Sequence, residues 1–239
     1  MLLPFFASDV AASGTITFDH AEFNFGQMPV NGASSHTFWI HATGTDTVVI
    51  DTVIPGCGCT TIPLSKRTLA PGDSVAFEIV FDSKGLIGSV AKRPGLKLRG
   101  DTTLHSVKFY ASVVTKEEQY FPLAIMPPMF TLPEKEAREG EKFPFQLHNL
   151  SDEDVSVGII DFPAELFAVD LPDSIAAGKT VTGHFSLLPG FPEGEDIYKS
   201  ITFELNHSQL YRLTAPIVMK SLKPVSDTTD SSKDSGEEQ

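Results

Sequence analysis

The stretch Ser74-Val-Ala-Phe-Glu-Ile-Val-Phe-Asp82 places a large apolar side chain at every second position. Val75, Phe77, Ile79 and Phe81 share one parity, and Glu78 is among the residues between them. Because successive side chains of an extended strand point to opposite faces, a period of two gathers the apolar side chains on one face. The stretch therefore predicts a half-buried β-strand, with a hydrophobic core on one side.

The same alternation recurs on both sides of this stretch, at residues 38–42, 48–50 and 107–113. Turn-forming sequences separate the runs. They are TGTD at 43–46, APGD at 70–73, SKG at 83–85 and RGD at 99–101. Several short strands divided by such turns are typical of a β-sandwich, so we predict an all-β protein.

The chain also repeats its plan of strands and turns. Residues 40–50 (IHATGTDTVVI) align with residues 147–157 (LHNLSDEDVSV), at an offset of 107 residues. Residues 69–75 (LAPGDSV) align with residues 175–181 (IAAGKTV), at an offset of 106 residues. Since an internal repeat indicates domain number more firmly than length does, we predict two tandem immunoglobulin-like β-sandwich domains.

The repeat and the composition together predict the domain limits. The first domain should span residues 14–116 and the second residues 117–222, because charged residues follow the last strand of the first copy. Residues 1–13 are apolar and have two interpretations, the remnant of a signal peptide or a frayed apolar end. Residues 223–239 are polar and acidic, and we expect them to form a disordered tail.

Charge excludes one class of partner. The chain has 239 residues, of which 31 are acidic and 18 are basic, so its formal net charge is −13. A polyanion would be repelled, and we therefore predict no binding to nucleic acid. No apolar stretch has the length of a transmembrane helix, so no transmembrane segment is expected. The sequence does not indicate an oligomeric state.

Five motifs of the first copy follow one another along the chain, and Gly88 comes shortly after the last of them. They are FGQMP at 25–29, HTF at 36–38, PGCGCT at 55–60, LAPGDS at 69–74 and FDSKG at 81–85. Together, over about residues 15–115, they resemble the bacterial domain-of-unknown-function family fifteen seventy-three. That family is similar to the Hydin-type (ASH-like) immunoglobulin-like domains. The second copy lacks the cysteine motif and counts only as a related sandwich.

The resemblance implies a fold, a location and a kind of role. It implies an immunoglobulin-like sandwich that is periplasmic, associated with the cell envelope or secreted. If no signal peptide precedes the chain, the alternative location is the cytoplasm. A binding or structural role follows from the resemblance only by analogy, because one fold serves many functions.

The segment Cys57-Gly58-Cys59-Thr60 is the candidate chemical motif, and three interpretations stay open. The cysteines pack as small apolar residues beside glycines that allow a tight turn. Alternatively, a bend at Gly58 brings them together in a disulfide, which would serve redox chemistry rather than stability. In the third interpretation the two thiolates bind a soft metal ion such as Cu(I), or share Zn²⁺, with further ligands. The aligned residues 163–166 of the second copy contain no cysteine or histidine, so the sandwich does not need this pair.

No catalytic motif is found in the sequence. It lacks a Gly-x-Ser-x-Gly elbow, a phosphate-binding glycine loop and an HExxH segment. The histidines mostly alternate with apolar strand residues, so we expect them on solvent-exposed faces. We predict a non-enzymatic module without a cofactor, and the alternative is a thiol-based soft-metal or redox module centred on Cys57 and Cys59.

The predicted partner is a protein that contacts sandwich edges or loops. Residues 121–130 are rich in proline and apolar side chains. Pro122, Pro127 and Pro128 are incompatible with a central strand, so this segment should be an edge strand. The candidate inter-domain or partner surface consists of Phe121, Ile125, Met126, Met129 and Phe130.

Overall fold

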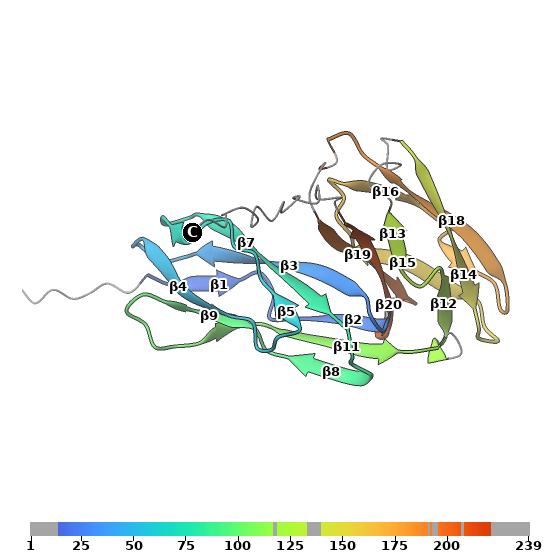
Figure 1. Ribbon diagram of the computed structural model, residues 1–239, viewed down its shortest axis with the longest axis horizontal. Coiled ribbons are helices and arrows are strands. Elements are labelled where there is room, and N and C mark those ends of the chain that lie inside the picture. The colour runs from blue at the N-terminus through green and yellow to red at the C-terminus, as the bar shows by residue number, and fades with distance from the viewer. Residues whose placement is uncertain are drawn as a thin grey trace, which may run out of the picture.

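The computed structural model describes residues 14–116, 119–132, 140–190, 192, 196–206 and 208–220. The predicted N-terminal segment and acidic tail, and residues 117–118 at the predicted boundary, lie outside the described residues. The described part is built from β-strands and contains no α-helix, which confirms the predicted all-β sandwich class (Figure 1). Below, "first sandwich" denotes residues 14–116 and "second sandwich" denotes residues 119–220.

Two sheets belong to the first sandwich alone. One contains, in spatial order, β1 (Ile16–Phe18), β3 (Ala33–Ala42), β7 (Ser74–Asp82) and β5 (Thr60–Thr61). The other contains β10 (His105–Ser106), β9 (Gly95–Leu98), β4 (Val48–Ile54) and β6 (Thr68–Leu69).

A third sheet continues from one sandwich into the other. Its order is β17 (Ser174–Ile175), β15 (Val155–Asp161), β19 (Ile197–Leu205), β20 (Ser208–Met219), β2 (Glu22–Pro29), β11 (Lys108–Val114) and β8 (Gly88–Lys92), and β13 (Phe130–Leu132) also pairs with β20. The fourth sheet contains β12 (Leu123–Met126), β14 (Lys142–Asn149), β18 (Thr180–Leu187) and β16 (Phe167–Asp170). The position of β12 at the edge of this sheet confirms the edge strand that the prolines predict.

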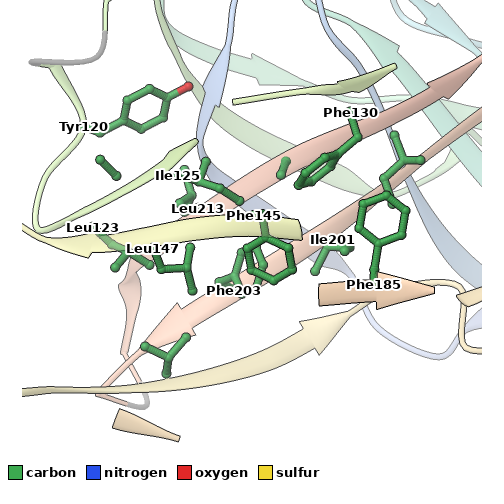
Figure 2. Packing of buried hydrophobic residues seen from close by; sticks show 14 of the residues in the cluster. Tyr120, Leu123, Ile125, Phe130, Phe145, Leu147, Phe185, Ile201, Phe203 and Leu213 are labelled. Carbon is green, nitrogen blue, oxygen red and sulfur yellow. The ribbon is translucent and has the colours of Figure 1, made fainter. Parts of the chain in front are cut away.

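The buried apolar side chains form two separate clusters, one centred in each sandwich, and Val114 at the end of the first sandwich packs into the cluster of the second. In the first, all four apolar residues of the alternating run in β7 are buried, as predicted. Phenylalanine fills both cores. The fully buried rings are Phe25, Phe38, Phe77, Phe81 and Phe109 in the first sandwich, and Phe145, Phe167, Phe185 and Phe203 in the second. Figure 2 shows Phe145, Phe185 and Phe203 within the second cluster.

The third sheet crosses between the sandwiches where β2 lies beside β20, with Gln27 opposite Leu213. Gly26 makes this approach possible. Its φ is +68°, and a Cβ atom at this position would lie 2.0 Å from the carbonyl oxygen of Arg212. Glycine is the residue that accepts both a positive φ and such close backbone contact.

Hydrogen bonds and an ion pair connect the two sandwiches near this junction. The Ser200 hydroxyl donates to the backbone oxygen of Ser35 at 3.0 Å and accepts from its N–H at 3.2 Å. The Thr214 hydroxyl donates to the carbonyl oxygen of Phe25 at 2.5 Å. Lys199 forms an ion pair with Glu78 across the same interface. Since several of these groups are buried, they would lose their partners if the sandwiches separated.

Candidate functional site

A disulfide joins Cys57 and Cys59 across the single residue Gly58. Of the three interpretations of this motif, the structure therefore shows the disulfide, with the two Cα atoms 5.2 Å apart. Gly56, just before the pair, has a φ of +83°, and this turn starts the bend that brings the sulfur atoms together. The bend leads directly into β5.

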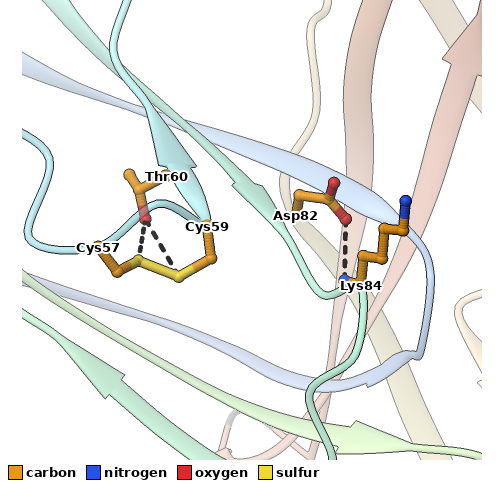
Figure 3. Close-up of a disulfide and its surroundings, with 5 residues drawn as sticks. All are labelled: Cys57, Cys59, Thr60, Asp82 and Lys84. Atoms are coloured by element: carbon orange, nitrogen blue, oxygen red, sulfur yellow. Dashed lines mark hydrogen bonds between the residues drawn. A yellow bond between two sulfur atoms is a disulfide. The ribbon is translucent and has the colours of Figure 1, made fainter.

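Thr60 lies against the disulfide. Its residue is only 5% exposed, and its hydroxyl oxygen lies 3.2 Å from Cys57 Sγ and 4.0 Å from Cys59 Sγ (Figure 3). The backbone N–H of Asp82 donates to the carbonyl oxygen of Cys59 at 2.9 Å, so β7 holds the motif from the other side. The four predicted residues thus form one compact group.

The disulfide borders a cleft of about 620 Å³ that both sandwiches line. Gly58, Cys59 and the charged residues Asp82 and Lys84 contribute from the first sandwich, and Tyr198 and Lys220 from the second. Figure 3 shows Asp82 and Lys84 beside the motif, with the Lys84 N–H donating to the Asp82 carboxylate at 2.9 Å.

Tyr198 is the titratable group of this cleft with an altered pKa. Burial raises the pKa of its phenol, and the nearby carboxylates of Asp196 and Asp82 raise it further because they disfavour a second negative charge. The phenol therefore faces the cleft as a neutral group at physiological pH.

The soft-metal interpretation needs two free thiolates and further ligands. Both sulfur atoms are used in the disulfide. Within the described ranges, no group of three or more His, Cys, Asp or Glu side chains is arranged to hold a metal ion. The motif in this form is therefore a disulfide site.

A second cleft, of about 480 Å³, lies across the third sheet where the sandwiches meet. Gln27, Tyr110 and residues of β8 line it from the first sandwich, and Phe121 and Tyr211 line it from the second. Phe121 is 59% exposed and Tyr211 is 43% exposed. Two large aromatic side chains thus stand in solvent beside one cleft.

The predicted inter-domain or partner surface divides into an outer and an inner part. Phe121 and Met126 are exposed and Met129 is half-buried, whereas Ile125 and Phe130 lie in the core of the second sandwich. Ile125 lies on the edge strand β12 and Phe130 on β13, which pairs with β20, and both side chains pack into the same core cluster. Only Phe121, Met126 and Met129 are therefore placed to reach a partner.

The same segment also contacts the first sandwich. The backbone N–H of Phe121 donates to the Gln27 side-chain oxygen at 3.0 Å, and the Gln27 amide donates to the Gln119 carbonyl oxygen at 3.0 Å. Met126 and Pro29 line a small cleft of about 260 Å³ between the two sandwiches.

The expectation that the histidines stand on solvent-exposed faces is wrong for His36, which is only 8% exposed. Its Nδ1 lies 2.7 Å from the Asp161 carboxylate of the second sandwich, and its Nε2 lies 2.8 Å from His20 Nε2. The ring stacks on Phe23 with 3.6 Å between centroids. The signal was present in the sequence, because His36 precedes the buried Phe38 by two residues and so shares its face.

The sequence was compared with protein-family models and with curated proteins. The family model described as "Protein of unknown function (DUF1573)" matches residues 16–113. This DUF1573 match covers the first sandwich, including the disulfide motif, and supports the resemblance that the five motifs indicate. The likeness to Hydin-type domains and the relation of the second sandwich stay predictions. None of the curated proteins matches the sequence.

The solved structures that match this chain do so at low sequence identity and with low TM-scores. A protein of unknown function from Porphyromonas gingivalis W83 is 11% identical with a TM-score of 0.35, over 86% of this chain and 99% of that one. The periplasmic chaperone SfaE is 10% identical with a TM-score of 0.34, over 86% of this chain and 100% of that one. The VesB protease of Vibrio cholerae is 16% identical with a TM-score of 0.35. The match covers 41% of this chain and 31% of that protein. Likenesses of this size carry no functional argument.

Proposed function

We propose that this chain is a non-enzymatic protein-binding module of the bacterial cell envelope. The observation that carries the proposal is the cleft across the third sheet, because the exposed Phe121 and Tyr211 of the second sandwich line it together with the half-buried Tyr110 of the first. The hydrogen bonds between the sandwiches hold the two halves of this surface together. A composite surface of this kind needs both domains.

The composition of this cleft suits a protein partner. Tyr110, Phe121 and Tyr211 supply large aromatic side chains, and Arg212 supplies a guanidinium group. Aromatic residues and arginine are enriched in the energetically important parts of protein interfaces. The Arg212 guanidinium is held by Glu204 at 2.7 Å, so it is already ordered before a partner binds.

An open sheet edge lies next to the cleft. β8 ends the strand order of the third sheet, and among the described strands it pairs only with β11. Its Ser89 and Ala91 are exposed, and Ser89, Val90 and Ala91 also line the cleft. A partner strand that pairs with β8 would therefore place its neighbouring side chains against the aromatic residues.

The location in the envelope is supported by the resemblance of the first sandwich to its family. Separately, no part of the described chain forms a helix with the length and apolar content that a membrane span requires, and this finding bears on no particular location. Fractionation of cells that express the full-length gene product tests the location. Recovery only with the cytoplasmic fraction would contradict it.

Photocrosslinking tests the surface. A photoreactive phenylalanine analogue at position 121 or 211 should yield the same crosslinked protein partner, and Phe121→Ala should reduce the yield at position 211. The matched control is position 104, because Leu104 is exposed to a similar degree and lies outside the cleft. Equal crosslinking at all three positions would show that the cleft is not the binding surface.

A further inference from the structure

We infer that the Cys57–Cys59 disulfide is a thiol–disulfide exchange site for protein dithiols. This activity is additional to the proposed binding role and does not depend on the aromatic cleft. Three features of the disulfide support this inference: it closes a minimal loop, it is open to a cleft, and a buried hydroxyl lies closer to Cys57 Sγ, at 3.2 Å, than to Cys59 Sγ, at 4.0 Å.

The disulfide is not what holds its segment in place. It encloses only Gly58, and a loop of this size removes little entropy from the unfolded chain. The segment is anchored instead by the pairing of β5 with β7 and by the hydrogen bond from Asp82 to the Cys59 carbonyl oxygen. Reduction can therefore occur while the sandwich stays folded, as an exchange site requires.

Access to the disulfide is open on one side. Cys57 and Cys59 are half-buried and Gly58 is exposed, and, its two chain neighbours apart, no heavy atom lies within 4 Å of the place where a Gly58 Cβ would stand. Gly58 and Cys59 line the cleft of about 620 Å³, whereas Cys57 is not among its lining residues. An attacking thiolate that enters through the cleft therefore meets Cys59 Sγ first.

The surroundings of the two sulfur atoms favour the same direction of attack. When a thiolate attacks Cys59 Sγ, the S–S bond breaks and its electron pair goes to Cys57 Sγ. The Thr60 hydroxyl lies 3.2 Å from that atom and can donate a hydrogen bond to the new thiolate. Lys84 and Lys220 line the same cleft and favour the negative charge of the approaching thiolate.

The complete exchange balances without a further reactant. The first substrate thiolate forms a mixed disulfide with Cys59 and releases the Cys57 thiolate. The second substrate thiolate then attacks the substrate sulfur of the mixed disulfide and releases the Cys59 thiolate. The substrate dithiol is oxidised to a disulfide, Cys57 and Cys59 are reduced to a dithiol, and the two substrate protons pass to the released thiolates or to water.

Single-cysteine variants test the direction of attack. The probe is a synthetic peptide with two cysteines, both activated as mixed disulfides with a chromogenic thiol so that the peptide cannot cyclise, and the products are measured by intact-protein mass spectrometry. Cys57→Ser leaves Cys59 at the cleft and should form the peptide adduct at least about tenfold faster than Cys59→Ser, which leaves Cys57 beside Thr60. Equal rates, or a faster reaction of Cys59→Ser, would overturn the inference.

Reduction of the oxidised, folded protein provides the second test. Native full-length protein is incubated with the reduced peptide dithiol or with glutathione, quenched with acid, alkylated and weighed. We expect reduction without loss of the folded circular dichroism signal, and faster reduction by the peptide if proteins are the substrates. Thr60→Val should slow reduction about tenfold, the effect of losing one hydrogen bond to a charged group, and Thr60→Ser should restore it.

Two outcomes of this experiment would contradict the inference. One is a disulfide that is reduced only at denaturant concentrations that unfold the chain, and the other is an equal rate for Thr60→Val and the native protein. Faster reduction by glutathione than by the peptide would contradict the assignment to protein dithiols. If Thr60→Val does not fold, the comparison of the single-cysteine variants decides the question alone.

Discussion

His36 of the first sandwich and Asp161 of the second are joined side chain to side chain, with 2.7 Å between Nδ1 and the carboxylate oxygen. The His36 ring is buried against Phe23 and Phe38, so the imidazole cannot turn to another partner without losing its packing. The pair therefore fixes how β3 lies relative to β15, and with it the two halves of the surface we propose for partner binding.

Removal of either partner of this pair should destabilise the chain. We expect Asp161→Asn or His36→Asn to lower the free energy of unfolding in urea by about 1.5–3 kcal/mol, the range for a hydrogen bond that involves a charged group. A double-mutant cycle should return a coupling energy of about 1 kcal/mol. His41→Asn is the control, because His41 contacts Ser74 within the first sandwich. A coupling energy near zero would mean that the pair contributes nothing to the junction.

Gly26→Ala should disrupt the junction between β2 and β20. A Cβ atom there would lie 2.0 Å from the Arg212 carbonyl oxygen, so backbone must move in addition to the strain of a positive φ. We expect a loss of about 3 kcal/mol or more in the free energy of unfolding. The control is Gly72→Ala, where φ is +84° but no atom lies within 4 Å, and the loss should be about 1 kcal/mol. Equal losses would exclude the steric explanation.

Removing the disulfide should affect stability only slightly. The double variant Cys57→Ser/Cys59→Ser should fold and lose about 1.5 kcal/mol, because a loop closed across one residue has little entropy to restrict. Phe81→Ala gives the comparison, since a fully buried ring lost from the core costs about 3–5 kcal/mol. Thermal unfolding of both variants measures the difference. A larger loss for the cysteine variant would make the disulfide a structural one.

Asp101 should make the stability depend on acidic pH. Hydrogen bonds from the side chain and the backbone N–H of Thr103, and then from His105, lower the pKa of its carboxyl from 3.8 to about 2. A carboxyl whose pKa is lower in the folded state than in the unfolded chain stabilises the protein at every pH above its unfolded-state pKa, near 4. This contribution is lost as the pH falls toward 2.

The measurement for Asp101 is thermal unfolding of the native chain and of Asp101→Asn as a function of pH. The native chain should melt at the higher temperature near neutral pH, and the two melting temperatures should converge between about pH 4 and pH 2. Asp152→Asn, at an exposed turn position, is the control. A difference that stays constant down to pH 2 would contradict the lowered pKa.

The sequence predicted the chemistry of the cleft only as a choice among three possibilities. Residues 57–60 were recognisable as a motif, but the pairing of Cys57 with Cys59 depends on the bend around Gly56 and Gly58, and local composition does not specify that bend. Likewise, residues 121–130 were recognisable as an apolar segment. Which of them face solvent depends on the sheet that covers Ile125 and Phe130.

The sequence by itself determined the alternating strands such as β7 and β11 with their apolar faces, the edge position of β12 and the class of the fold. These are local properties, because side-chain alternation and proline act within a few residues. Only the tertiary structure decided that β2 lies beside β20, that His36 meets Asp161 and that Cys59 opens onto a cleft shared by both sandwiches. The first two contacts join residues more than a hundred positions apart, and the cleft depends on such contacts. The period of a single strand carries no information about its distant neighbours.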